Sequence, residues 1–135
     1  MMTDSAIWAN DGTVRQNEEK RELDRFAKYC FGALGLPPIS IHYCPAPSLV
    51  DQHGNYCFGC YAYDENVKEI FLSYRLPKWG LMSVIAHELW HYKQHHDGRI
   101  DTIPLEECEK EAEDASKELL AYWLKRGGKV GEPHD

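Results

Sequence analysis

The sequence predicts an α+β domain made of an N-terminal helix, a small and mostly antiparallel sheet of three strands, and two C-terminal helices. Three observations predict this class. Apolar residues recur every three to four positions in three segments, which is the spacing of an amphipathic helix. Apolar and polar residues alternate between the first and second of these segments, as in half-buried strands. Gly and Pro residues separate the segments, and a length of 135 residues suits one domain with a single core.

The first expected helix runs from Asn17 to about Leu34, and Gly35 and the Pro37-Pro38 pair end it. Its apolar side consists of Leu23, Phe26, Ala27, Cys30 and Leu34.

Three strands are expected between the first and second helices, at residues 39–43, 56–63 and 69–74. Residues 44–55, with two prolines and a glycine, are expected to form a loop. We expect residues 16–126 to form one domain, with flexible segments at residues 1–15 and 127–135.

The second helix is predicted between two sets of helix breakers. Pro77 and Gly80 precede it, Gly98 follows it, and neither Pro nor Gly lies between Gly80 and Gly98. Its apolar side is formed by Leu81, Ile85, Leu89 and Tyr92.

This helix carries an HExxH motif, His87-Glu88-Leu89-Trp90-His91. Histidines four residues apart lie one turn above each other, so that both rings can reach one metal ion. Glu88 lies about 100° further round the helix, where it can contact a water on that metal but is badly placed to bind the metal. Two ligands and a base beside an activated water are what a zinc hydrolase needs, and the motif therefore predicts a Zn²⁺ site.

The third helix is predicted from about Thr102 to Arg126, with Pro104 in its first turn and Gly127 at its end. An apolar stripe is expected along Leu105, Cys108, Ala112, Leu119 and Trp123, and the solvent side is expected to carry Glu107, Glu111 and Glu118.

One glutamate of the third helix, Glu109, falls inside the apolar stripe. A carboxylate there is costly unless it is paired or binds a metal, so Glu109 is the preferred third zinc ligand. Glu106, at the border of the stripe, is the main alternative. Glu113, one turn after Glu109, is expected to hydrogen-bond the outer nitrogen of a ligand histidine and to fix its tautomer.

Further residues are candidates for contacts with a reacting substrate. His95, one turn after His91, is expected to point toward the side of His87, and His95, Tyr92 and Tyr63 are candidate donors to an oxyanion. Asp97 occupies the third-ligand position of the metzincin pattern HExxHxxGxxH. That pattern requires glycine where this chain has Gln94, which disfavours a metzincin-like site.

The two motif segments resemble the gluzincins, the thermolysin-like group of zinc peptidases. Residues 87–94 resemble the active-site helix of small single-domain and ImmA-like members, and residues 109–113 resemble their glutamate helix, written E-x-x-A-D. The resemblance spans about residues 55–125 and implies that Glu109 binds zinc, although Glu113 replaces the closing aspartate. It also implies that a sheet edge beside the active-site helix binds the substrate backbone as an added strand, and the segment 56–74 is the candidate.

A second metal site is an alternative use of the cysteines. Cys57 and Cys60 form a CxxC pair that, with Cys44 and either His42 or His53, has the composition of a structural zinc site. The competing interpretation is a kinked strand with packed, inert thiols.

Composition narrows the function. The formal net charge is −7 and the sequence shows no basic stripe, which argues against nucleic acid and anionic membranes as partners, and against a DNA-associated peptidase of the SprT-like type. Five cysteines at irregular spacing and an N-terminus unlike a signal peptide favour a cytoplasmic protein. We therefore expect a zinc-dependent peptidase that acts on a peptide or protein, with Glu88 as general base and acid. The alternatives are a non-catalytic zinc-binding regulatory or interaction module, and a metal-free scaffold.

Overall fold

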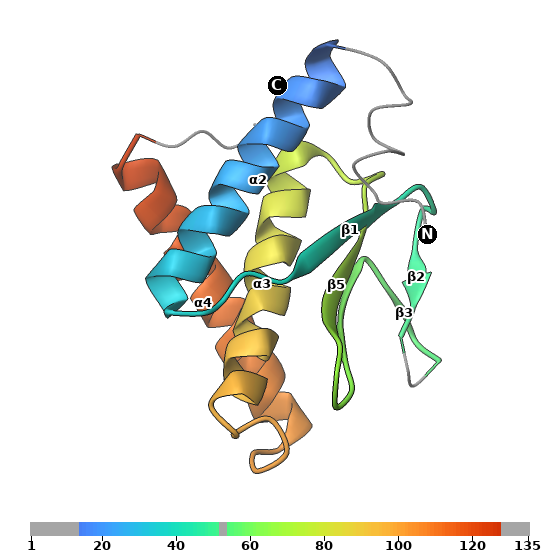
Figure 1. The fold of residues 1–135 in the computed structure, drawn as a ribbon, viewed down its shortest axis with the longest axis vertical. Coiled ribbons are helices and arrows are strands. Elements are labelled where there is room, and N and C mark those ends of the chain that lie inside the picture. The colour runs from blue at the N-terminus through green and yellow to red at the C-terminus, as the bar shows by residue number, and fades with distance from the viewer. Residues whose placement is uncertain (1–13, 52–53, 128–135) are drawn as a thin grey trace.

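Helix α3 lies between a small sheet and two other long helices (Figure 1). The computed structural model describes residues 14–51 and 54–127. In chain order the elements are α2 (Val14–Leu34), β1 (Ser40–Cys44), β2 (Leu49–Val50), β3 (Tyr56–Cys57), β4 (Gly59–Tyr63), β5 (Lys68–Ser73), α3 (Lys78–His96) and α4 (Leu105–Lys125). This order confirms the predicted α+β class. The flexible segments expected at the termini lie outside the described residues, apart from residues 14, 15 and 127.

The sheet of three strands has the order β1-β5-β4. The pair β4–β5 is antiparallel and aligns Tyr61 with Ile70, whereas the pair β1–β5 is parallel and aligns Ile41 with Ile70. Among the strands in residues 14–51 and 54–127, only β5 is paired on both sides, so β4 is an edge strand of this sheet.

The strand expected at residues 56–63 is interrupted at Phe58. The carbonyl of Phe58 still accepts a hydrogen bond from the Ser73 amide at 2.9 Å, which keeps the chain attached to the end of β5. The two preceding residues turn away and form β3, which pairs with β2 inside the segment expected to be a loop. The loop prediction was wrong at Leu49 and Val50 because their partner strand arises only from this interruption.

Helix α2 covers α3 on the side away from the sheet (Figure 1). Its predicted apolar side is confirmed, since Leu23, Phe26 and Cys30 are fully buried. The helix ends at Gly35, which takes a φ of +67° that a residue with a side chain rarely adopts.

Helix α3 follows Pro77 directly and ends before Gly98, whose φ is +75°. The apolar side predicted for it is confirmed, because Leu81, Ile85, Leu89 and Tyr92 are at most 1% exposed. Two polar residues of the helix, Glu88 and Gln94, are also buried. Burying polar groups costs free energy unless they are hydrogen-bonded or used, so these two residues mark the functional part of the helix.

Helix α4 begins later than predicted, at Leu105, because residues 99–102 form a turn in which the Thr102 amide donates to the Arg99 carbonyl at 2.9 Å. Cys108, Ala112 and Leu119 are buried as predicted. Leu105 is 72% exposed, so its expected place in the core was wrong. A helical wheel gives the direction of a side chain but not where the neighbouring helix stops, and Leu105 is the first residue of its helix.

Among the described residues, no helix combines the length and apolar character required to cross a lipid bilayer.

Candidate metal centre

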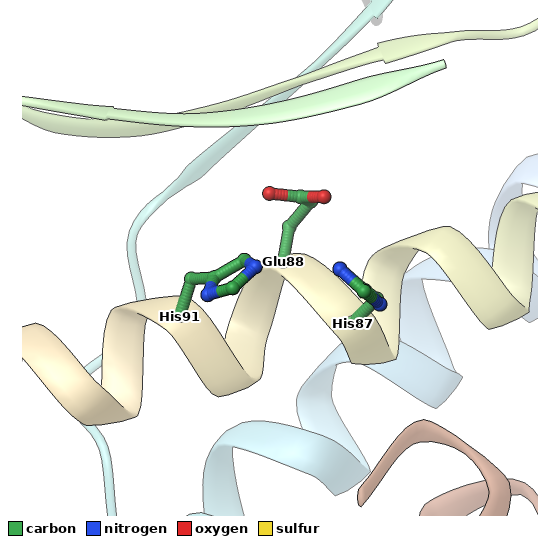
Figure 2. A group of neighbouring side chains, drawn as sticks. All are labelled: His87, Glu88 and His91. Carbon is green, nitrogen blue, oxygen red and sulfur yellow. The ribbon is translucent and has the colours of Figure 1, made fainter. Parts of the chain in front are cut away.

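The HExxH motif lies in the middle of α3, and its three polar side chains point to one side (Figure 2). The potential ligand atoms of His87, Glu88 and His91 all lie within 4.8 Å of one another, so the group can hold a metal ion. The two imidazole rings stand edge to face with centroids 4.9 Å apart. Figure 2 shows Glu88 rising between the histidines toward the strands above the helix. The prediction that the motif occupies one helix face is confirmed.

Helix α4 brings a second carboxylate to the histidines. Glu109 Oε1 lies 3.2 Å from Nε2 of His87, and Glu109 Oε2 lies 2.8 Å from Nε2 of His91. The hydrogen bonds from His87 and His91 hold the pKa of Glu109 well below its usual range. Glu106 was the main alternative as third ligand. Among the described ion pairs, none joins Glu106 to either histidine. Two helices thus converge on one point through three side chains.

The contacts of Glu109 with His87 and His91 can be compared with the spacing of ligand atoms around a metal ion. In a tetrahedral site with bonds of about 2.0–2.2 Å, neighbouring ligand atoms are about 3.4 Å apart. The observed separations of 3.2 and 2.8 Å between Glu109 and the two Nε2 atoms differ from that value by a few tenths of an ångström. The Glu109 side chain is 51% exposed and has room to adjust.

Protonation in the cluster follows from burial and charge. Burial alone lowers the pKa of His91, but hydrogen bonds to Glu109 and Gln94 and the charge of Glu88 outweigh it, so that the pKa is raised. The outer nitrogen of His87, Nδ1, lies 3.7 Å from Glu113 Oε2, which is too far for the hydrogen bond expected between them. The Glu113 side chain is 60% exposed, so water can reach this contact.

Glu88 is held between α3 and β4. Its side chain is 9% exposed, and burial raises the pKa of its carboxyl group, whereas the charges of the histidines and a hydrogen bond from the Tyr61 backbone lower it. Gly59 makes this approach possible: a Cβ atom on Gly59 would clash with Val84 Cγ1 and lie 3.3 Å from Glu88 Cγ. The absence of a side chain at Gly59 therefore sets how closely β4 approaches the motif.

A cleft of about 730 Å³ opens over the motif. Its lining includes β4 with the preceding Phe58, Ile103 from the connection before α4, and Leu105, the first residue of α4. Phe58 and Leu105 are 51% and 72% exposed, so the cleft combines a polar floor with apolar walls.

The candidate oxyanion donors have different surroundings. His95 Nδ1 lies 2.6 Å from the Tyr61 hydroxyl, and the ring of Tyr63 stacks on His95 at 3.9 Å. Tyr61 and Tyr63 line the cleft, whereas the Tyr92 hydroxyl donates to the Pro37 carbonyl at 2.9 Å and has a structural role. Sequence reasoning missed Tyr61, although its position two residues before Tyr63 in a strand places both on the same face.

A second group missed in the sequence surrounds Gln94. Its side chain bonds His91, the Cys108 carbonyl and Glu111, and Glu111 also accepts from Trp90 and Arg99. The expectation that Glu111 faces solvent was wrong, because the chain after α3 folds back and places Arg99 beside it at 2.7 Å. Glutamine at an apolar helix position was the signal available in the sequence.

Among the described residues, no cluster of potential metal ligands includes Cys57, Cys60 or Cys44, so a structural metal at the CxxC pair has no support there. His42 instead bonds Glu69 at 3.1 Å and stacks on Phe71, and His53 lies outside the described residues. Burial raises the pKa of the Cys60 thiol to about 11, as expected for an inert cysteine.

Asp97 caps the C-terminus of α3 and pairs with Lys93 at 3.0 Å, so it takes no part in the cluster.

Comparison of the chain with protein-family models, with curated proteins and with solved structures finds no match. The chemistry of the cluster therefore has to support any function by itself.

Proposed function

We propose that this protein is a zinc-dependent peptidase with a gluzincin-like ligand set, in which His87, His91 and Glu109 hold the ion. One observation carries the proposal: the Glu109 carboxylate on α4 contacts the Nε2 atoms of both histidines of α3, next to the buried Glu88. Three protein ligands with one open position are typical of catalytic zinc, whereas structural zinc is usually enclosed by four.

Glu88 is the proposed general base. When bound, zinc acts as a Lewis acid toward a peptide carbonyl and makes water nucleophilic at neutral pH. The Glu88 carboxylate accepts the proton of the attacking water and returns it to the departing amine. Its burial favours this role, because a carboxylate shielded from water is a stronger base than an exposed one.

The edge strand β4 is the proposed binding surface for the substrate backbone. It lies next to the motif, it has a partner strand only on the β5 side, and it lines the cleft. An extended peptide can pair with such an edge through main-chain hydrogen bonds. The exposed Phe58 and Leu105 would then contact apolar side chains of the peptide.

The test is Glu88→Gln, measured against wild type and Glu118→Gln. Glu118 is an exposed residue of α4, so its substitution controls for the loss of one acidic charge. We expect all three proteins to bind one zinc, and Glu88→Gln alone to lose cleavage of a peptide library by about 10²–10⁴-fold. Cleavage by Glu88→Gln at the wild-type rate would refute the mechanism. Zinc binding by wild type without chelator-sensitive cleavage of any peptide would favour a non-catalytic zinc module.

A further inference from the structure

Gln94 is a fully buried polar residue whose hydrogen bonds join the two helices of the metal centre. It is 0% exposed and lies one turn after His91 on α3. Its Oε1 atom lies 2.8 Å from Nδ1 of His91. Its Nε2 atom donates to the Cys108 carbonyl at 3.1 Å and to Glu111 Oε1 at 3.2 Å, both on α4. All the polar atoms of this buried side chain therefore have partners.

The surroundings fix which way the amide of Gln94 points. The Cys108 carbonyl can only accept a hydrogen bond, and Arg99 donates to both oxygens of Glu111, which makes the carboxylate an acceptor as well. The NH₂ group must face these two acceptors, so the amide oxygen must face His91. An amide oxygen only accepts, and Nδ1 of His91 must therefore carry a proton.

We propose that Gln94 is a positioning residue for the metal centre: it holds the proton of His91 on Nδ1, so that Nε2, which faces Glu109, is the nitrogen left to bind a metal ion. The inference rests on His91 being a metal ligand, as in the proposed function, and not on peptide hydrolysis. A neutral histidine has one protonated nitrogen, so a partner that fixes the proton on Nδ1 leaves Nε2 free to bind metal.

The Gln94 side chain also links the positions of His91 and Glu109, the proposed ligands on the two helices. Cys108, whose carbonyl accepts from Gln94, immediately precedes Glu109 in the chain. Gln94 thus bonds one ligand directly and the backbone beside another. Glu111, the other acceptor for the Gln94 amide, also accepts hydrogen bonds from Arg99 at 2.7 Å and from the indole N–H of Trp90 at 3.2 Å.

The first experiment reads the proton position of His91 in metal-free protein. Glu109→Ala removes the carboxylate that competes for Nε2. At a pH where His91 is neutral, we expect ¹⁵N NMR to show the proton on Nδ1 in Glu109→Ala. In the double variant Glu109→Ala, Gln94→Met, we expect a mixture of both tautomers. A neutral ring in Glu109→Ala with its proton on Nε2 would overturn the proposal, and this reading does not require that a Gln94 variant folds.

The second experiment measures zinc affinity in otherwise native protein. Gln94→Met keeps the unbranched shape and loses the hydrogen bonds, and we expect about 10–100-fold weaker zinc binding. Arg99→Met is the matched control, since it disturbs Glu111 but leaves the bond between Gln94 and His91. We expect its zinc affinity to stay within about twofold of wild type, which is small beside the loss of about 10–100-fold that is typical when the partner of a ligand histidine is removed.

Equal weakening in both variants would show that Gln94 only supports the fold and would overturn the proposal, as would an unchanged affinity in Gln94→Met. If wild type binds no zinc, the proposed function fails. The NMR experiment on metal-free Glu109→Ala still tests whether the proton of His91 is held on Nδ1.

Discussion

Oε2 of Glu109 on α4 lies 2.8 Å from Nε2 of His91 on α3. The two residues belong to different helices that are joined by the connection between Asp97 and Pro104. Their contact means that the metal centre depends on the packing of α4 against α3, and that a change in either helix acts on the same atoms.

Replacing Glu109 should weaken metal binding more than replacing any other acidic residue of α4. Glu109→Gln removes one ligand charge, and we expect zinc affinity to fall at least about tenfold. Glu106→Gln is the matched control in the same helix, with no expected change. Isothermal titration of the metal-free proteins measures both. Equal affinities for wild type and Glu109→Gln would contradict the ligand assignment.

Zinc should stabilise the folded protein by an amount that grows with the logarithm of the free zinc concentration. A ligand that binds only the native state at a hundredfold excess over Kd adds about 2.7 kcal/mol to the free energy of unfolding. We expect Tm to rise by several degrees with zinc, to fall with a chelator, and to change little with magnesium, which prefers six oxygen ligands. A Tm that is independent of zinc would argue against a site formed by the native fold.

Gly59→Ala should separate β4 from the motif. The added Cβ clashes with Val84 Cγ1 and contacts Leu72 Cδ2 at 3.1 Å, so we expect a loss of about 1–3 kcal/mol in the free energy of unfolding. Gly32→Ala is the control, because a Cβ there meets nothing within 4 Å and favours helix, with an expected gain of about 0.5–1 kcal/mol. Urea denaturation compares the two. A harmless Gly59→Ala would mean that β4 does not need to lie this close to Glu88.

The bond between Glu111 and Arg99 should appear in the pH dependence of stability. The Arg99 guanidinium lowers the pKa of Glu111 from 4.5 to about 2. A carboxylate with a lowered pKa in the folded state stabilises it above pH 4.5, and this contribution is lost as pH falls toward 2.

The test compares the unfolding free energy of wild type and Glu111→Gln from pH 7 to pH 2. We expect wild type to be more stable at neutral pH and the difference to shrink below about pH 4.5. A difference that stays constant over this range would contradict the assignment of the stabilisation to the charged pair.

The helices and the position of the motif could be predicted from the sequence because both depend on local spacing. Histidines four residues apart share a helix face wherever the helix packs, and Leu81, Ile85 and Leu89 mark the buried side. The contact of Glu109 with both histidines followed from one observation, a carboxylate in an apolar stripe. The same observation favoured Glu109 over Glu106, but the distances from Glu109 to the two histidines depend on how α4 packs against α3.

The sheet could not be derived in the same way. Parallel pairing of β1 with β5 joins residues far apart in the chain, and periodicity says nothing about such partners. Glu111 was misplaced for a related reason: its partner Arg99 lies on a turn whose path is set by tertiary contacts, not by a helical repeat.

The proposed ligands His87, His91 and Glu109 all come from one pair of neighbouring helices, and the last ligand follows the first by 22 positions in the chain. A loop this short closes at little entropic cost, because that cost grows only with the logarithm of length. The sheet supplies none of these ligands, but through Gly59 and Tyr61 it supplies the shelter around Glu88. If the proposed function holds, metal binding depends on the two helices, whereas catalysis also depends on the sheet. A change confined to β4 would then leave a protein that binds zinc but hydrolyses peptides poorly.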